Sequence, residues 1–104
     1  MPYVLRLSEE TQEQIAEFLD TVPPDEHTVA LDAIFIELMK IADDPRTASH
    51  AGALTPCHHF PVRLAGRMRP VSATFVYASD EKHLNLVEFR ELEPWEWARD
   101  VLDP

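Results

Sequence analysis

The spacing of apolar residues along this chain alternates between two periods, and this alternation constrains the fold more than any other sequence feature. Tyr3, Leu5 and Leu7 recur at every second residue, which predicts a short strand with one buried face. Helical spacing follows, and the period of two returns from His58 onward. A strand, a helical region and a group of strands in this order predict an α+β fold.

Two helices are predicted between the first strand and the middle of the chain. Ser8 can cap the first helix, Glu9–Asp20, because its hydroxyl can accept a free amide of the first turn. Pro23 ends that helix, and the second is predicted over Pro24–Ala42. Its broad apolar band, which makes it the main core element, consists of Leu31, Ile34, Phe35, Leu38 and Ile41. The short turn between the helices predicts an antiparallel helical hairpin packed over a sheet.

Three strands and a final helix are predicted in the second half. A polar surface loop over Arg46–Cys57 leads to strands at 58–64, 69–77 and 83–90. Ala65–Met68 and Ser79–Lys82 have the composition of tight connections, so the strands form an antiparallel meander. The tail Glu93–Pro104 begins with Glu-Pro and is predicted to be a short helix.

Alternation also assigns the side chains of each strand to a face of the sheet. On the first of these strands, the side chains expected to point inward are Phe60, Val62 and Leu64, and those expected to point outward are His59, Pro61 and Arg63. On the second strand, one face is expected to carry Val71, Ala73, Phe75 and Tyr77. On the last strand, Leu84 and Leu86 are expected to lie opposite Val87 and Phe89.

Residues 45–79 form one long segment without Asp or Glu in an otherwise acidic chain. The segment contains four arginines and carries a charge of +4, whereas the rest has 5 basic and 19 acidic residues, which leaves a net charge of −10. Such segregation predicts a local surface field that attracts an anion the whole molecule would repel. The alternative is that a strand-rich middle simply has no room for carboxylates.

Composition indicates a single domain over residues 1–104 without metal or cofactor. Cys57 is the only cysteine, so the chain forms no internal disulfide, and no Cys/His pairs have the spacing of a zinc site. Because no helix N-terminus and no clear base lies beside it, Cys57 is expected to be a buried or inert thiol. The N-terminus lacks the pattern of a signal peptide, and no apolar run approaches the roughly 18 residues of a membrane span. We expect a cytoplasmic protein that does not bind membranes.

The order of these elements and several short motifs resemble the RelE/ParE superfamily of toxins from bacterial type II toxin–antitoxin systems. The matching segments, which extend through most of the chain, are Tyr3–Ser8, Ala30–Ile34 with Leu38, Asp43–Pro45, Phe60–Arg63, Ala65–Arg69 and Val87–Arg90. The resemblance implies an N-terminal strand, an α-helical hairpin, an antiparallel three-stranded meander and a short C-terminal helix.

For RelE-like members, the resemblance implies a ribosome-dependent mRNA endonuclease that uses no metal. Basic residues on a sheet face grip the RNA and stabilise charge while the ribose 2′-hydroxyl attacks. By position, the family's strand arginines correspond to Arg63, Arg69 and Arg90. A guanidinium suits this role because it binds a phosphate with two hydrogen bonds and keeps its proton. The site requires the three arginines to gather on one exposed face; scattered, or paired with glutamates, they would leave only a toxin-like scaffold.

His59 is the candidate general base of such a site. Imidazole titrates near neutral pH, and alternation places His59 on the same face as Arg63. The adjacent His58 points to the opposite face, so at most one of the two rings can serve. The alternative for the arginines is chance exposure on a solvated sheet face.

A protein-binding member of the same superfamily is the second functional class that the sequence allows. The chain has no lysine between Lys40 and Lys82 and is acidic, whereas the RNA-cleaving members are generally basic. ParE-like members act on DNA gyrase, and an inactive member retains only its antitoxin. Trp95 and Trp97 cannot share a helix face, so one is expected to be an exposed contact residue, unless both pack across the sheet edge. The expected partners are a cognate antitoxin in either class and the ribosome and mRNA for a nuclease, with a homo-oligomer left open.

Overall fold

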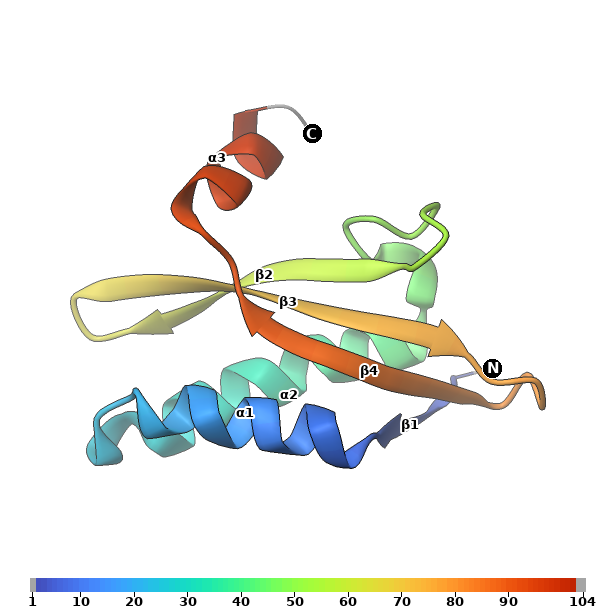
Figure 1. Ribbon diagram of the computed structural model, residues 1–104, viewed down its shortest axis with the longest axis horizontal. Helices are drawn as coiled ribbons and strands as arrows, with labels where there is room; N and C mark the ends of the chain where they lie inside the picture. The colour runs from blue at the N-terminus through green and yellow to red at the C-terminus, as the bar shows by residue number, and fades with distance from the viewer. Residues whose placement is uncertain (1, 103–104) are drawn as a thin grey trace.

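Two helices cover one face of a four-stranded sheet, and a third helix lies on the other side of it (Figure 1). The computed structural model describes residues 2–102, with side chains for residues 2–100. The elements in chain order are β1 (Val4–Leu7), α1 (Glu9–Asp20), α2 (His27–Asp43), β2 (Cys57–Leu64), β3 (Arg67–Tyr77), β4 (His83–Glu91) and α3 (Pro94–Leu102). This order confirms the predicted α+β fold, its helical pair, its meander and its final helix. That helix was predicted to reach Pro104, and the last two residues lie outside the described part of the chain.

Three boundaries differ from the prediction. Pro24–Glu26 form a 3-10 turn, so α2 begins only at His27, and a second 3-10 turn, Pro45–Thr47, opens the predicted loop. The connection between β2 and β3 is shorter than expected, because β3 already begins at Arg67. Gly66 turns this hairpin with a φ of 74°, a left-handed conformation that glycine adopts without steric cost.

The sheet is mixed, with strand order β1-β4-β3-β2. β1 pairs in parallel with β4, whereas β2, β3 and β4 pair antiparallel as a meander. The N-terminal strand therefore closes one edge by pairing with the last strand of the chain, and β2 forms the other edge.

A β-bulge interrupts the pairing of β3 with β4. Thr74 pairs with Glu88, but the next residue, Phe75, pairs with Leu86, so Val87 has no partner on β3. An unpaired residue of this kind shifts the alternation of every side chain that follows it on the strand.

The bulge corrects one prediction about the faces of β4. Leu84, Leu86 and Phe89 are all buried on the helix-covered face, whereas Val87 is 37% exposed. The expected grouping of Phe89 with Val87, opposite the two leucines, is therefore wrong. Because Phe89 points toward the helices, the next residue, Arg90, points away from them.

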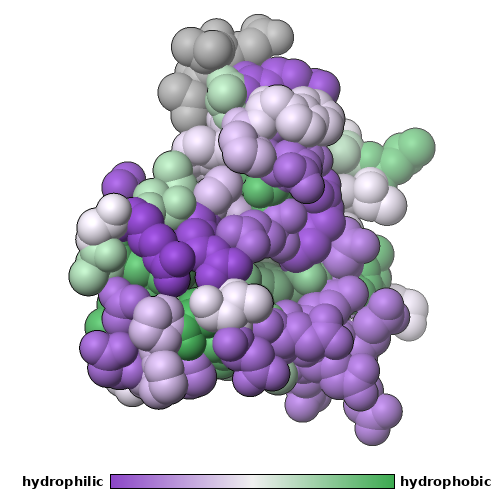
Figure 2. All heavy atoms as spheres, turned by 60° about the vertical axis from the view of Figure 1, so that its left-hand side comes forward, coloured by the Kyte–Doolittle hydropathy of each residue, from purple (hydrophilic) through white to green (hydrophobic). Residues whose placement is uncertain are grey.

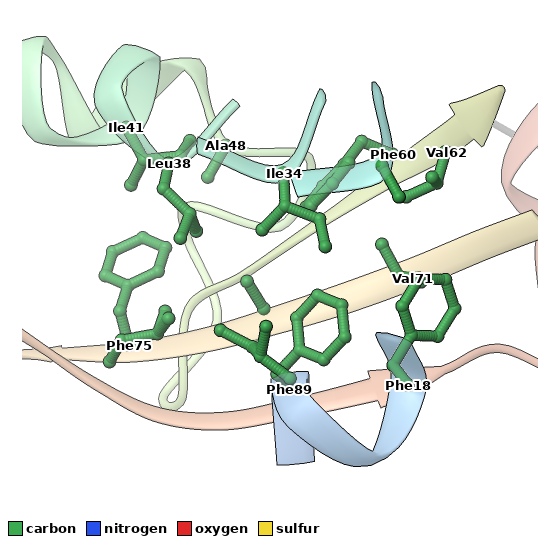
Figure 3. Packing of buried hydrophobic residues seen from close by; sticks show 14 of the residues in the cluster. Phe18, Ile34, Leu38, Ile41, Ala48, Phe60, Val62, Val71, Phe75 and Phe89 are labelled. Atoms are coloured by element: carbon green, nitrogen blue, oxygen red, sulfur yellow. The ribbon is translucent and has the colours of Figure 1, made fainter. Parts of the chain in front are cut away.

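The core lies between the sheet and the two helices (Figure 3). It is formed by side chains of α1 and α2 and by inward side chains of the strands, among them Phe18, Ile34, Leu38, Ile41, Phe60, Val62, Val71, Phe75 and Phe89. The end of the molecule with the α1–α2 connection and the β2–β3 hairpin is mainly hydrophilic on its surface (Figure 2). Within residues 2–102, no helix combines the length and the apolar character needed to cross a bilayer.

Polar side chains attach α1 to β4 close to the bulge. Ser8 Oγ accepts the Thr11 amide at 3.1 Å, which confirms the predicted helix cap. Buried Thr11 donates its hydroxyl to the carbonyl of Leu86 at 2.9 Å, and Gln14 Oε1 accepts the amide of Phe89 at 2.7 Å. These bonds join α1 directly to the backbone of β4 on both sides of the bulge.

We predict that the same truncation destabilises the protein strongly at one isoleucine of α2 and hardly at all at another. Ile34 is fully buried, so Ile34→Ala is expected to lower the free energy of unfolding by about 2–5 kcal/mol. Ile36 is 57% exposed, so Ile36→Ala is expected to change it by less than about 0.5 kcal/mol. Urea denaturation measures both values. Equal losses in the two variants would contradict the described orientation of α2.

Candidate functional site

Three of the four predicted site residues, His59, Arg63 and Arg90, lie on the open face of the sheet, which we define as the face turned away from α1 and α2. His59 of β2 pairs with Ser72 of β3, and Ser72 pairs with Arg90 of β4, so the three stand in one row. Since neighbouring strands lie about 4.8 Å apart, the backbones of His59 and Arg90 are separated by roughly 10 Å. Ser72, between the two larger side chains, is itself buried.

Arg69 lies on the opposite face, beneath α1. Its Nε and Nη2 donate to both carboxylate oxygens of Glu91 at 2.8 and 2.7 Å, and its Nη1 donates to Thr21 Oγ1 at 2.7 Å. The guanidinium also lies 4.4 Å from the centroid of the Phe18 ring. Arg69 lowers the pKa of Glu91, and Glu91 raises the pKa of Arg69. The expectation that Arg69 shares one exposed surface with the other two arginines is wrong, because its side chain joins the end of α1 to the sheet.

Arg90 faces the open side but is paired with α3. Its Nη1 and Nη2 donate to the two carboxylate oxygens of Glu96 at 3.1 and 2.9 Å, and Glu88 lies 3.8 Å from its Nε. Hydrogen bonding to Arg90 lowers the pKa of Glu96 to about 2. Arg69 and Arg90 are therefore each neutralised by a glutamate, on opposite faces of the sheet, and form no common anion site.

Arg63 is exposed on the open face near the end of β2. It lies four residues beyond His59, which corresponds to roughly 13 Å along an extended strand. It forms no ion pair with any residue in the described part of the chain. Of the three matched arginines, only Arg63 has a guanidinium that is not paired with a carboxylate there.

The loop before β2 folds back along that strand and brings a second histidine to the open face. The amide of His50 donates to the carbonyl of Cys57 at 3.0 Å, and the two residues form an isolated β-bridge. Ser49 stabilises the same arrangement, since its Oγ accepts the amide of His59 at 3.2 Å. The ring of His50 consequently packs edge-on against the ring of His59, with 4.6 Å between the centroids.

His59 is held from both sides by polar groups. Its Nδ1 forms a short contact with Asp100 Oδ2 of α3, and its Nε2 lies 3.6 Å from Cys57 Sγ. Asp100 Oδ1 also lies 3.4 Å from Nε2 of His50. Because a carboxylate occupies Nδ1, the lone pair of Nε2 is available for a proton or a metal ion.

Cys57, His59 and Asp100 contact one another in space in the sequence of a catalytic triad: a nucleophile, a base and a carboxylate that orients the base. However, burial raises the pKa of the Cys57 thiol, so the thiol keeps its proton at neutral pH unless a ligand displaces it. Nucleophilic catalysis by free Cys57 is therefore disfavoured. Base chemistry at His59, or metal binding by the whole cluster, fits the arrangement better.

Sequence reasoning missed three members of this cluster. Cys57 and His59 are two residues apart on a strand and therefore share a face, which was a usable signal. His50 and Asp100 carried no such signal, because the fold of a loop and the docking of a terminal helix bring them to the same place.

The outer face of α2 exposes a group of large apolar side chains. Four large apolar side chains are neighbours there: Val29, Phe35, Ile36 and Met39, with exposed fractions of 55%, 40%, 57% and 54%. We call these four residues the α2 patch. Adjacent exposed apolar side chains on a helix commonly mark a surface that another protein covers.

Comparisons of this chain with protein-family models, with curated proteins and with solved structures found no match. The resemblance to RelE/ParE toxins therefore rests on its motifs and its order of elements, and it stays a prediction.

We predict that acid releases α3 from the open face. The pKa of Glu96 falls from 4.5 to about 2 in the folded protein, so its stabilising contribution is present above pH 4.5 and is lost as the pH falls toward 2. Both tryptophans, Trp95 and Trp97, lie on α3, so their fluorescence reports its position. The emission should change between about pH 4.5 and 2.

The matched variant for this prediction is Glu96→Gln, which keeps the shape of the side chain and removes its charge. We expect its emission at pH 7 to be shifted already toward that of the acid form, with a smaller change on acidification. Identical acid titrations of the two proteins would show that the Arg90–Glu96 pair does not hold α3.

Proposed function

We propose that this protein is a RelE/ParE-like member of a type II toxin–antitoxin system that acts by binding another protein, in the first place its cognate antitoxin. The observation that carries the proposal is the α2 patch, four large apolar side chains gathered on one exposed helix face. The pairing of Arg69 with Glu91 and of Arg90 with Glu96 argues against a three-arginine endonuclease.

The chemistry of the α2 patch indicates what its partner offers. Full burial of one large apolar side chain contributes about 1.5–3 kcal/mol, so covering even part of four such side chains supports a specific complex. Asp32 lies within the patch and Glu37 and Asp43 lie on the same helix, in a chain with a net charge of −10. A complementary segment therefore combines apolar anchor residues with flanking lysines or arginines.

We predict that Ile36→Asp weakens partner binding at least about tenfold, because it places a charge at the centre of an apolar contact. Val4→Asp is the matched control, since Val4 is 58% exposed on the edge strand β1 and is not part of the α2 patch. The measurement is titration of each purified variant with the product of the adjacent reading frame. Growth of cells that express the variant with and without that reading frame gives a second readout.

Equal weakening by Ile36→Asp and Val4→Asp would contradict a role of the α2 patch. An adjacent product that binds neither variant nor the unsubstituted protein would contradict the toxin–antitoxin assignment itself.

RNA cleavage is the second candidate function, and one observation favours it: His59 and Arg90 share the open face on either side of Ser72. In this candidate, neutral His59 takes the proton of the ribose 2′-hydroxyl at Nε2, the 2′-oxygen bonds to phosphorus, and the 5′-oxygen leaves and is protonated by water. A phosphate must displace Glu96 from Arg90. Ion pairs at a protein surface are individually weak, so the displacement is energetically accessible. Arg63 lies on the same face and can contact a neighbouring phosphate.

For the nuclease candidate, we predict that His59→Ala and Arg90→Ala each reduce RNA cleavage in translating extracts by about a hundredfold or more. His58→Ala is the matched control, because the adjacent ring points to the helix side and pairs with Glu37 at 2.9 Å. Unchanged toxicity in the His59 and Arg90 variants, with binding of the adjacent product weakened in Ile36→Asp, would leave protein binding as the function.

A further inference from the structure

We propose that His50, Cys57 and His59 form a binding site for one zinc-class divalent ion on the open face of the sheet. One ligand atom from each residue lies within 4.8 Å of the others. One thiolate and two imidazoles are the donors that Zn²⁺ prefers, whereas Mg²⁺ and Ca²⁺ require oxygen donors. The proposal does not depend on the protein's being a toxin or a nuclease.

The separation of two ligand atoms already matches that of a loaded site. With Zn–S near 2.3 Å and Zn–N near 2.0–2.1 Å at a tetrahedral angle, the sulfur and nitrogen of one ion lie about 3.5 Å apart. Cys57 Sγ and His59 Nε2 lie 3.6 Å apart. An ion can therefore enter between them with little movement of β2, where the two residues stand on the same face.

The contacts of Asp100 are those of a carboxylate behind a metal-binding histidine. Asp100 Oδ2 contacts Nδ1 of His59, which fixes the ring and directs Nε2 toward Cys57. Histidines that bind metals commonly donate their second nitrogen to such a carboxylate, which orients the ring and raises its basicity. Asp100 thus acts as a positioning residue and not as one of the three ligands.

His50 supplies an independent observation. Its Nε2 is buried and has no hydrogen-bond partner among the described residues, although it lies 3.4 Å from Asp100 Oδ1. Buried polar atoms are nearly always satisfied, so an unsatisfied nitrogen beside a thiol and a second imidazole points to a ligand. The remaining coordination position is open to water, since a cavity of about 110 Å³ adjoins His50, His59 and Asp100 beneath α3.

Ion binding changes the protonation of the cluster in a defined way. The thiol of Cys57 loses its proton to solvent as the Zn–S bond forms, and the two imidazoles bind as neutral rings. A bound ion also occupies the lone pair of His59 Nε2, so the loaded site cannot supply the base of the nuclease candidate.

The test is titration of the whole protein with Co²⁺ and Zn²⁺ under reducing conditions. We expect one equivalent of Co²⁺ to give tetrahedral d–d bands and a thiolate-to-cobalt charge-transfer band in the near ultraviolet, and Zn²⁺ to displace it. Cys57→Ser should remove the charge-transfer band, and His50→Ala should weaken binding while the protein stays folded, because His50 lies on a surface loop. Asp100→Asn should lower the affinity for Zn²⁺ about 10- to 100-fold.

His83→Ala is the matched control, because His83 is a histidine outside the proposed cluster that pairs with Asp80. It should bind Co²⁺ and Zn²⁺ like the unsubstituted protein. The proposal is overturned if Co²⁺ gives no thiolate band. It is also overturned if His50→Ala and Cys57→Ser bind Co²⁺ and Zn²⁺ as strongly as the unsubstituted protein does. None of these readouts uses a partner protein or RNA, so failure here is distinct from failure of the proposed function.

Discussion

The β-bulge at Val87 is the constraint on which the arrangement of both sheet faces depends. Without the unpaired residue, strict alternation from Leu84 and Leu86 would turn Phe89 out of the core and Arg90 into it. With it, Phe89 packs against Phe18 and Arg90 joins the row on the open face. Gln14 stabilises the interrupted strand by accepting the amide of Phe89, so α1 and the bulge support one another.

Similar Arg–Glu pairs on the two faces of the sheet have different structural roles. Beneath α1, Arg69 contacts Glu91, Thr21 and the ring of Phe18 and completes the packing of a helix end. On the open face, Arg90 pairs with Glu96 of a helix that packs there through polar contacts. Such exposed pairs are individually weak, so α3 is attached less firmly than α1.

Folding pairs two of the four arginines of the acid-free segment, residues 45–79, with carboxylates. Carboxylates from outside the acid-free segment reach into it: Asp44 pairs with Arg46, and Glu91 pairs with Arg69. The face of Arg69 could nevertheless have been predicted, because it has the same parity as Val71 and Phe75 on an unbroken stretch of β3. The face of Arg90 could not have been predicted, because no residue type in β4 indicates that the strand contains a bulge.

The sequence by itself determined the order of the elements, the main core helix and the shared face of His59 and Arg63, because these follow from local periodicity and capping. Only the tertiary structure decided which distant groups meet. The loop before β2 placed His50 beside Cys57, and the last helix placed Asp100 against His59. The parallel pairing of β1 with β4 added the N-terminal strand to the edge of the sheet. These contacts join residues far apart in the chain, so their geometry depends on the packing of whole elements and leaves no pattern in the local sequence.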